Sequence, residues 1–179
     1  MSYAVPKLYV LLNSTVASSS ASISFTSLIT SNFSTYYLRL RDVIPANNAD
    51  ALLMTFSTDN GANYLATNYQ WSNMFQISSN LTGINVSNSD TSGAIALVMR
   101  SSATPGMNAD IYLFNMNSGT YNPSYLGNVV QSNDSNGNLG LGSFSGRNTT
   151  TTAVTAIKLV SSTGNIASGT FNFYGVNEP

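Results

Sequence analysis

Hydrophobic and polar residues alternate along short stretches of the chain. In residues 37–43, Leu38 and Leu40 fall on one face of an extended segment, and Arg39 and Arg41 fall on the other. Such a period of two places successive side chains on opposite faces of a β-strand. This segment is therefore predicted to be a strand with one buried face and one face toward solvent.

The residues that follow predict a turn, a second strand and a hairpin. Proline and asparagine at positions 45–48 interrupt the alternation, because proline lacks the N–H that a sheet requires and asparagine tolerates turn geometry. Residues 52–57 are apolar enough to form a second strand. The pair Asn60-Gly61 supplies the positive φ angles of a tight hairpin turn, so the aromatic segment 64–71 is predicted to return as a third strand.

Short apolar segments and polar turns continue to the end of the chain. Further strands are predicted at residues 8–12, 21–28, 74–77, 94–99, 110–114, 150–160 and 170–174. Three serines at 18–20 are interpreted as a loop, and residues 127–149 are predicted to be the least regular part. No stretch has the period of a helix. About eight strands at irregular spacing predict an all-β fold, an antiparallel β-sandwich of the jelly-roll type, as one domain over residues 1–179.

Charged residues are scarce in this chain, and their scarcity bears on which kinds of molecule the protein can bind. Seven acidic and six basic residues give the chain a net charge of −1, and charged residues make up 7% of it. The hydrophobic share of 42% is periodic, so the shortage of charge does not indicate disorder. Because there is no basic patch, we expect no nucleic-acid partner. Because no apolar run approaches the length of a membrane span, we expect no membrane partner.

The beginning of the chain gives no sign of export. The apolar run at 8–12 follows Lys7, but it is too short for the core of a signal peptide and contains a tyrosine. We interpret it as the first strand. A near-neutral surface favours association of a free monomer, and this matters less for a protein that is docked on an assembly.

The residues that usually carry enzyme chemistry are rare or missing. The chain has no histidine and no cysteine, which removes most nucleophile–base pairs and the ordinary zinc and thiol sites. The acidic residues are scattered, so a pair of converging carboxylates is not indicated. The polar segments 59–61 and 133–136 lack the spaced acids of a calcium loop and are interpreted as turns. We therefore expect no catalytic residue, no cofactor and no metal, and a protein that is not an enzyme.

Aromatic residues are the remaining candidates for contact with a partner or a glycan. Tyr121 and Tyr125 flank a proline in a segment predicted to lie outside any strand, and Trp71 ends an aromatic segment. Exposed tyrosine and tryptophan stack on sugars or anchor protein interfaces. The alternative for each of them is packing in the core or at a sheet edge.

Three blocks of the sequence resemble a family of small structural proteins of tailed bacteriophages. The blocks are residues 41–46 through 56–61, residues 110–115, and residues 152–158 followed by 164–170 and 174–175. The resemblance implies a virion component, a β-sandwich and no catalytic residues to carry over. It leaves open whether the protein sits on the capsid or on the tail. The sequence departs from the family near Asn60, where a second glycine is more usual, and this affects a turn only.

Three functions follow as hypotheses. The first is a capsid decoration or cement protein that binds the major capsid protein, reinforces the shell and self-associates; a trimer around a local threefold axis is one arrangement compatible with it. The second is a tail-fibre or tail-appendage module that binds tail proteins and recognises host-surface glycan. Both place the protein on the virion surface after synthesis in the host cytoplasm. The third, a depolymerase, is the weakest because acids are sparse and histidine is missing.

Overall fold

The computed structural model describes residues 8–78, 82–102, 106–133 and 138–177. This part of the chain contains twelve strands and no helix. The strands are β1 (Tyr9–Ser20), β2 (Ile23–Thr26), β3 (Thr35–Pro45), β4 (Asp50–Ser57), β5 (Tyr69–Ile77), β6 (Thr82–Asp90), β7 (Gly93–Met99), β8 (Met107–Phe114), β9 (Ser124–Asn133), β10 (Asn138–Asn148), β11 (Ala156–Ser161) and β12 (Ile166–Val176). Every pairing between them is antiparallel.

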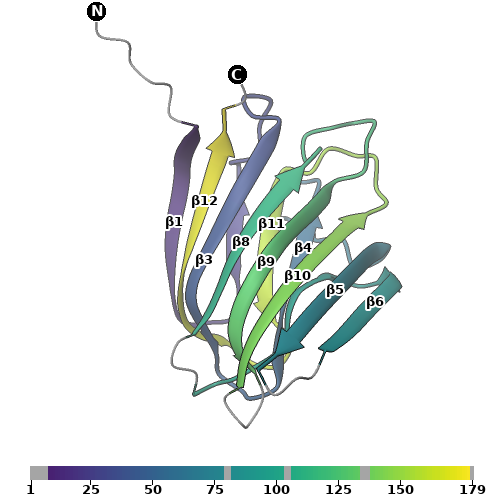
Figure 1. The fold of residues 1–179 in the computed structure, drawn as a ribbon. Coiled ribbons are helices and arrows are strands. Elements are labelled where there is room, and N and C mark those ends of the chain that lie inside the picture. The colour runs from purple at the N-terminus through teal and green to yellow at the C-terminus, as the bar shows by residue number, and fades with distance from the viewer. Residues whose placement is uncertain (1–7, 79–81, 103–105, 134–137, 178–179) are drawn as a thin grey trace, which may run out of the picture.

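The strands form two sheets that pack face to face (Figure 1). The larger sheet has eight strands in the order β1-β12-β3-β8-β9-β10-β5-β6, and the smaller has four in the order β7-β4-β11-β2. A single bridge between Met99, the last residue of β7, and Asn133, the last residue of β9, joins the two sheets. The predicted all-β fold and antiparallel β-sandwich are confirmed.

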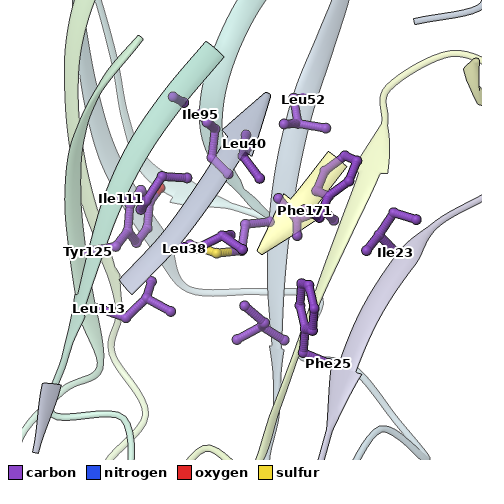
Figure 2. Close-up of a cluster of buried hydrophobic side chains, with 14 of the residues drawn as sticks. Ile23, Phe25, Leu38, Leu40, Leu52, Ile95, Ile111, Leu113, Tyr125 and Phe171 are labelled. Atoms are coloured by element: carbon purple, nitrogen blue, oxygen red, sulfur yellow. The ribbon is translucent and has the colours of Figure 1, made fainter. Parts of the chain in front are cut away.

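The inner faces of both sheets supply the core. Leu38 and Leu40 are buried while Arg39 and Arg41 face outward, so the alternation predicted for this strand is confirmed. Figure 2 shows side chains from both sheets directed toward one another in the space between the sheets. Burial of this apolar surface is the main term that stabilises the sandwich.

The turn predicted at Asn60-Gly61 forms, but the hairpin predicted to follow from it does not. Both residues take the positive φ angles that were predicted, 60° and 90°. The chain then crosses to the other sheet, because β4 already pairs with β7 on one side and β11 on the other. Only the end of segment 64–71 is a strand, since β5 begins at Tyr69.

The segment predicted to be least regular contains two long strands, so that prediction is wrong. β9 and β10 pair over ten residue positions, although the polar residues 134–137 between them lie outside the described part. Their inward positions hold Tyr125, Val129 and Phe144, which pack in the core. A Cβ atom at Gly146 would collide with the ring of Tyr125, which explains a glycine in this strand. Glycines fill several inward positions and leucines such as Leu126 and Leu141 lie on the outward side, so the alternation is weak in the sequence.

Two further boundaries differ from the sequence-based prediction. The serines at 18–20 belong to β1, which begins at residue 9 and pairs with β12 along its length, with one register shift between Leu11 and Asn13. Only the second half of segment 150–160 is a strand, because β11 begins at Ala156. β1 extends beyond its apolar residues because it pairs with β12, a long neighbouring strand. The β-propensities of the residues in β1 do not predict this extension.

Tyr69 makes the stability of the fold sensitive to alkaline pH. Its side chain is fully buried, and its hydroxyl oxygen accepts a hydrogen bond of 2.7 Å from the backbone N–H of Phe56. Burial raises the pKa of Tyr69 from 10.0 to about 12, against the smaller opposing effect of that hydrogen bond. The folded state therefore disfavours the phenolate, so this contribution to stability is present below pH 10 and is lost as the pH rises toward 12.

We expect the free energy of unfolding to fall between pH 9 and pH 11, and to fall less in Tyr69→Phe, which has no proton to lose. Urea unfolding at the two pH values measures the difference. At neutral pH the variant should be less stable, because the N–H of Phe56 loses its acceptor. An identical alkaline loss in both proteins would contradict the assignment to Tyr69.

Candidate interaction surface on the eight-stranded sheet

The outer face of the eight-stranded sheet carries a row of tyrosines. Strand register places Tyr174 of β12 opposite Tyr37 of β3, and Tyr37 opposite Tyr112 of β8. Residues directly opposite in antiparallel strands point to the same face. Tyr9 of β1 reaches over this row, with its ring centroid 5.1 Å from that of Tyr37 and 6.4 Å from that of Tyr174. We call these four residues the tyrosine cluster.

Hydrogen bonds fix the geometry of the tyrosine cluster. The hydroxyl groups of Tyr9 and Tyr112 lie 2.9 Å apart and are hydrogen-bonded above Tyr37. Tyr37 is thereby buried, although it belongs to the outer face of a sheet. The rings of Tyr37 and Tyr112 lie 5.1 Å apart in a tilted arrangement, which is favourable for aromatic pairs. The result is a second, small apolar layer outside the main core.

A charged pair borders the tyrosine cluster. The Nε of Arg39 donates to Asp110 at 3.1 Å, and the hydroxyl of Tyr37 donates to the same carboxylate oxygen. Burial, with added effect from the Asp110 charge, raises the pKa of Tyr37 well above its usual value. The hydrogen bond to Asp110 raises the pKa of Arg39. The hydroxyl of Tyr37 therefore stays protonated, and the border offers both a cation and hydrogen-bonding groups to a ligand.

Five large apolar side chains are exposed at the other end of the same face. They are Met74, Ile84, Val86, Leu126 and Leu141, with exposed fractions from 48% to 69%. Register pairs Met74 with Ile84, and the row of Tyr112 continues to Leu126. We call these residues the apolar patch. Shallow grooves of about 610 Å³ and 440 Å³ lie over it, and both are lined by Met74 and Ile84.

The three aromatic residues singled out from the sequence do not meet at one site. Tyr121 lies in the loop after β8 and is 67% exposed. Tyr125 lies in β9, contrary to the prediction that it is outside a strand, and it is buried in the core. Trp71 is half-buried, and its indole N–H donates to the carboxylate of Asp90 at 3.0 Å. Of the three, only Tyr121 offers most of its side chain to a partner.

The tyrosine cluster was missed in the sequence for a physical reason. Tyr37 and Tyr112 occupy the outward positions of strands whose inward positions hold Leu38 and Ile111. An outward tyrosine is an ordinary strand residue when it is considered alone. What marks the site is that several outward tyrosines lie side by side on neighbouring strands. This can be recognised only when the strand order is known.

The side chains on the outer face of the eight-stranded sheet are of the kinds that bind a partner molecule. Among the described residues, no group of three or more histidine, cysteine, aspartate or glutamate side chains lies close enough to hold a metal ion. In the same residues, no helix is long and apolar enough to cross a membrane. The outer face presents aromatic rings, aliphatic side chains and hydrogen-bonding groups, together with the ion pair of Arg39 and Asp110. These groups contribute contact area and hydrogen bonds.

Comparison with known proteins gives no family. No protein-family description and no curated protein matches the chain. Among solved structures, a chain of "Structure of infectious bursal disease virus Gx strain" is matched at 10% identity, with a TM-score of 0.14. The match covers 93% of this chain and 41% of that one, so the protein spans about two fifths of its length. At this TM-score the match has no bearing on fold or function.

Proposed function

We propose that the protein is a bacteriophage structural protein that decorates the capsid and binds the major capsid protein through the outer face of its eight-stranded sheet. The observation that carries the proposal is the apolar patch, five large side chains exposed together on one broad face. A contiguous exposed apolar surface of this kind marks a site of protein association. The sequence blocks that resemble phage structural proteins supply the class of partner.

The strand order supports a jelly-roll interpretation of the sandwich. Four neighbouring strands of the larger sheet are β1-β12-β3-β8, and they face β2-β11-β4-β7. Of these eight strands, successive ones alternate between the two sheets except at β4 and β7, which are neighbours in the smaller sheet; this is the pattern of a jelly roll. On this interpretation β5-β6 and β9-β10 are inserted hairpins that widen the larger sheet beyond β8. The same insertions carry the apolar patch, so they form the docking platform.

The composition of the outer face suits a permanent interface. Tyrosine and methionine are enriched at protein interfaces while lysine and glutamate are depleted there, and the apolar patch contains none of the charged types. With a net charge of −1, the chain is not strongly repelled by a neutral or weakly charged shell. Reinforcement would follow from bridging adjacent capsid subunits, and it requires no chemistry from this chain.

Leu141→Asp should abolish decoration of the capsid. Leu141 is 60% exposed in the apolar patch and lines a groove with Met74 and Ile84, so a carboxylate there would be desolvated on docking. We expect at least tenfold weaker binding to capsids that lack this protein, which corresponds to about 1.4 kcal/mol. Sedimentation of purified variants with such particles, followed by quantitative mass spectrometry, gives the bound copy number relative to the major capsid protein.

Val16→Asp is the matched control, because Val16 is 70% exposed but lies on β1 at the opposite edge of the sheet. It should bind like the unchanged protein, with a copy number comparable to that of the capsid protein. Equal loss in both variants would remove the patch as the docking site. A copy number typical of a tail component would overturn the capsid assignment itself.

The tyrosine cluster favours one second candidate, a tail appendage that recognises host glycan. Tyr9 is 37% exposed above a half-buried Tyr112, and Arg39 and Asp110 lie beside them. Aromatic faces bordered by hydrogen-bonding groups are suited to sugar rings. Glycan binding that is lost in Tyr9→Ala, together with few copies per particle, would support this alternative over decoration.

A further inference from the structure

β6 ends the eight-stranded sheet as an open edge. Among the described residues it pairs with β5 only, so the backbone groups along its other side have no partner strand. Figure 1 shows β6 as the last strand of the larger sheet, on the side opposite β1. Ile84, Asn85 and Val86 are all exposed, so both faces of the strand are open as well as its edge. A strand held on one side only is weakly stabilised.

The β6 edge lacks the features that keep sheet edges apart. Natural edge strands are protected by charged residues, prolines, bulges or short length. Residues 82–89 contain no charge and no proline, and residues 82–87 pair with residues 71–76 in a regular register. The one register shift lies between Ser87 and Asp90, at the end of the strand and away from Asn85. The other edges are irregular or short. β1 has a register shift between Leu11 and Asn13, β7 has register shifts against β4 and a bridge to β9 at Met99, and β2 has four residues.

We propose that β6 pairs antiparallel with β6 of a second copy of this chain around a twofold axis. Such pairing is self-complementary, because each copy presents the same strand to the other. In a register centred on Asn85, Ile84 of one copy lies opposite Val86 of the other, on the outer face. Cross-strand pairs of β-branched residues stabilise antiparallel sheets. The eight strands of each copy would then form one continuous sheet.

The low net charge of the chain and the position of Asp90 in β6 favour a second copy of this chain as the partner at the β6 edge. A net charge of −1 gives little repulsion between two copies. Asp90, the one charged residue of β6, lies at the end of the strand and accepts the hydrogen bond from Trp71, away from Asn85. The interface also joins the two apolar patches, since Met74 is opposite Ile84 in the adjacent strand. This interface does not depend on the proposed function, so its test needs only the purified chain.

The first test is the mass of the purified protein in solution, by analytical ultracentrifugation over a dilution series. We expect twice the 19.0 kDa of the chain, and at least tenfold weaker dimerisation in the double variant Ile84→Lys/Val86→Lys. The two lysines on each β6 strand would lie opposite the two lysines of the second copy, and their like charges would repel. Leu126→Lys is the matched control, being 48% exposed on the same face but in β9, and it should remain a dimer. Unchanged far-ultraviolet circular dichroism shows that each variant is folded.

The second test fixes the register. The chain has no cysteine, so Asn85→Cys introduces a single thiol, placed at the twofold axis. Directly opposite Cα atoms in an antiparallel pair are close enough for a disulfide. Mild oxidation should give a covalent dimer from Asn85→Cys and none from Val16→Cys.

Three results would overturn the proposal: a monomer at every concentration, a stable trimer, or a dimer that the lysine pair leaves intact. These results concern self-association alone. Ile84 and Val86 also belong to the apolar patch, so a lysine variant that is monomeric and still binds capsids would support this inference and count against the patch as the docking site. A dimer that binds no capsid would support the inference and remove the proposed function.

Discussion

Replacing Phe173 with alanine is expected to lower the free energy of unfolding by about 4 kcal/mol, the largest effect of any single change considered for this protein. Phe173 of β12 stacks between Phe25 of β2 and Tyr36 of β3, at centroid distances of 5.1 Å and 5.4 Å and interplanar angles of 18° and 6°. At most 1% of each of the three side chains is exposed.

The stack of Phe25, Phe173 and Tyr36 joins the two sheets, because Phe25 belongs to the smaller sheet and the other two to the larger. An alanine at 173 would leave a cavity bounded by both sheets, and neither sheet can close it without moving against the other. The cost therefore includes lost burial and an unfilled cavity. Tyr36 is held further by its hydroxyl, which donates to the carbonyl of Thr30 at 2.7 Å, so it cannot swing into the space.

Urea unfolding at neutral pH measures the effect of Phe173→Ala. Phe114→Ala is the control, since Phe114 is half-buried on the outer face of β8 and contacts Tyr112 in a stack of 6.4 Å. It should cost about 1 to 2 kcal/mol, because its site opens to solvent and leaves no enclosed cavity. If the two substitutions cost the same, the inter-sheet stack does not have the role assigned to it.

Replacing Asp50 with alanine is expected to cost about 3 kcal/mol at neutral pH, because it leaves buried hydrogen-bond donors without an acceptor. The Asp50 carboxylate is fully buried at the start of β4. It accepts hydrogen bonds from the hydroxyls of Ser161 and Ser162 and from the backbone N–H groups of Thr163 and Ala51. One side chain thereby fixes the end of β11 and the turn toward β12 to the beginning of β4.

The effect of Asp50→Ala should depend on pH in a defined direction. Burial alone raises the pKa of Asp50, but the hydrogen bonds from Ser161, Ser162, Thr163 and Ala51 together outweigh it, and the pKa lies below the ordinary 3.8. A lowered pKa means that the folded state prefers the carboxylate. This contribution to stability is therefore complete above pH 3.8 and is lost as the pH falls through the folded-state pKa.

Chemical unfolding at pH 7 and at pH 3 gives the free energies of unfolding of Asp50→Ala and of the unchanged protein. The difference at pH 7 checks the predicted cost, and its change with pH checks the predicted direction. The difference between the two proteins should be smaller at pH 3. Asp110→Ala provides the comparison. Its carboxylate is about half exposed, so the loss of the ion pair with Arg39 and of the hydrogen bond from Tyr37 should cost about 1 to 2 kcal/mol, less than the loss of Asp50. A difference for Asp50→Ala that grows as the pH falls would show that the carboxylate is not stabilised in the folded state.

Much of the local structure could be predicted from the sequence. The alternation of Leu38 and Leu40 with Arg39 and Arg41 gave the correct faces of β3, and the Asn60-Gly61 pair took the predicted positive φ angles. These features depend on residues that are neighbours or two positions apart. The all-β class follows from the same local patterns, which contain no helical period.

The candidate site was not predictable in this way. Tyr125 and Tyr121 are four positions apart, yet one is 2% exposed and the other 67% exposed, because a strand begins between them. The tyrosine cluster collects residues from four strands that lie far apart in the sequence. Each of its members looks ordinary in its own segment.

The sequence by itself determined many of the extended segments of this protein and their apolar sides, because side-chain alternation is a property of adjacent residues. It did not determine β6, β9 or β10. Only the tertiary structure decided which strands are neighbours. That order sent the chain after Gly61 to the second sheet, turned the weakly patterned segment 127–149 into two strands, and left β6 as an open edge. The physical reason is that sheet pairing is made by backbone groups, which every residue except proline shares, so strand order and register depend on how the whole core closes.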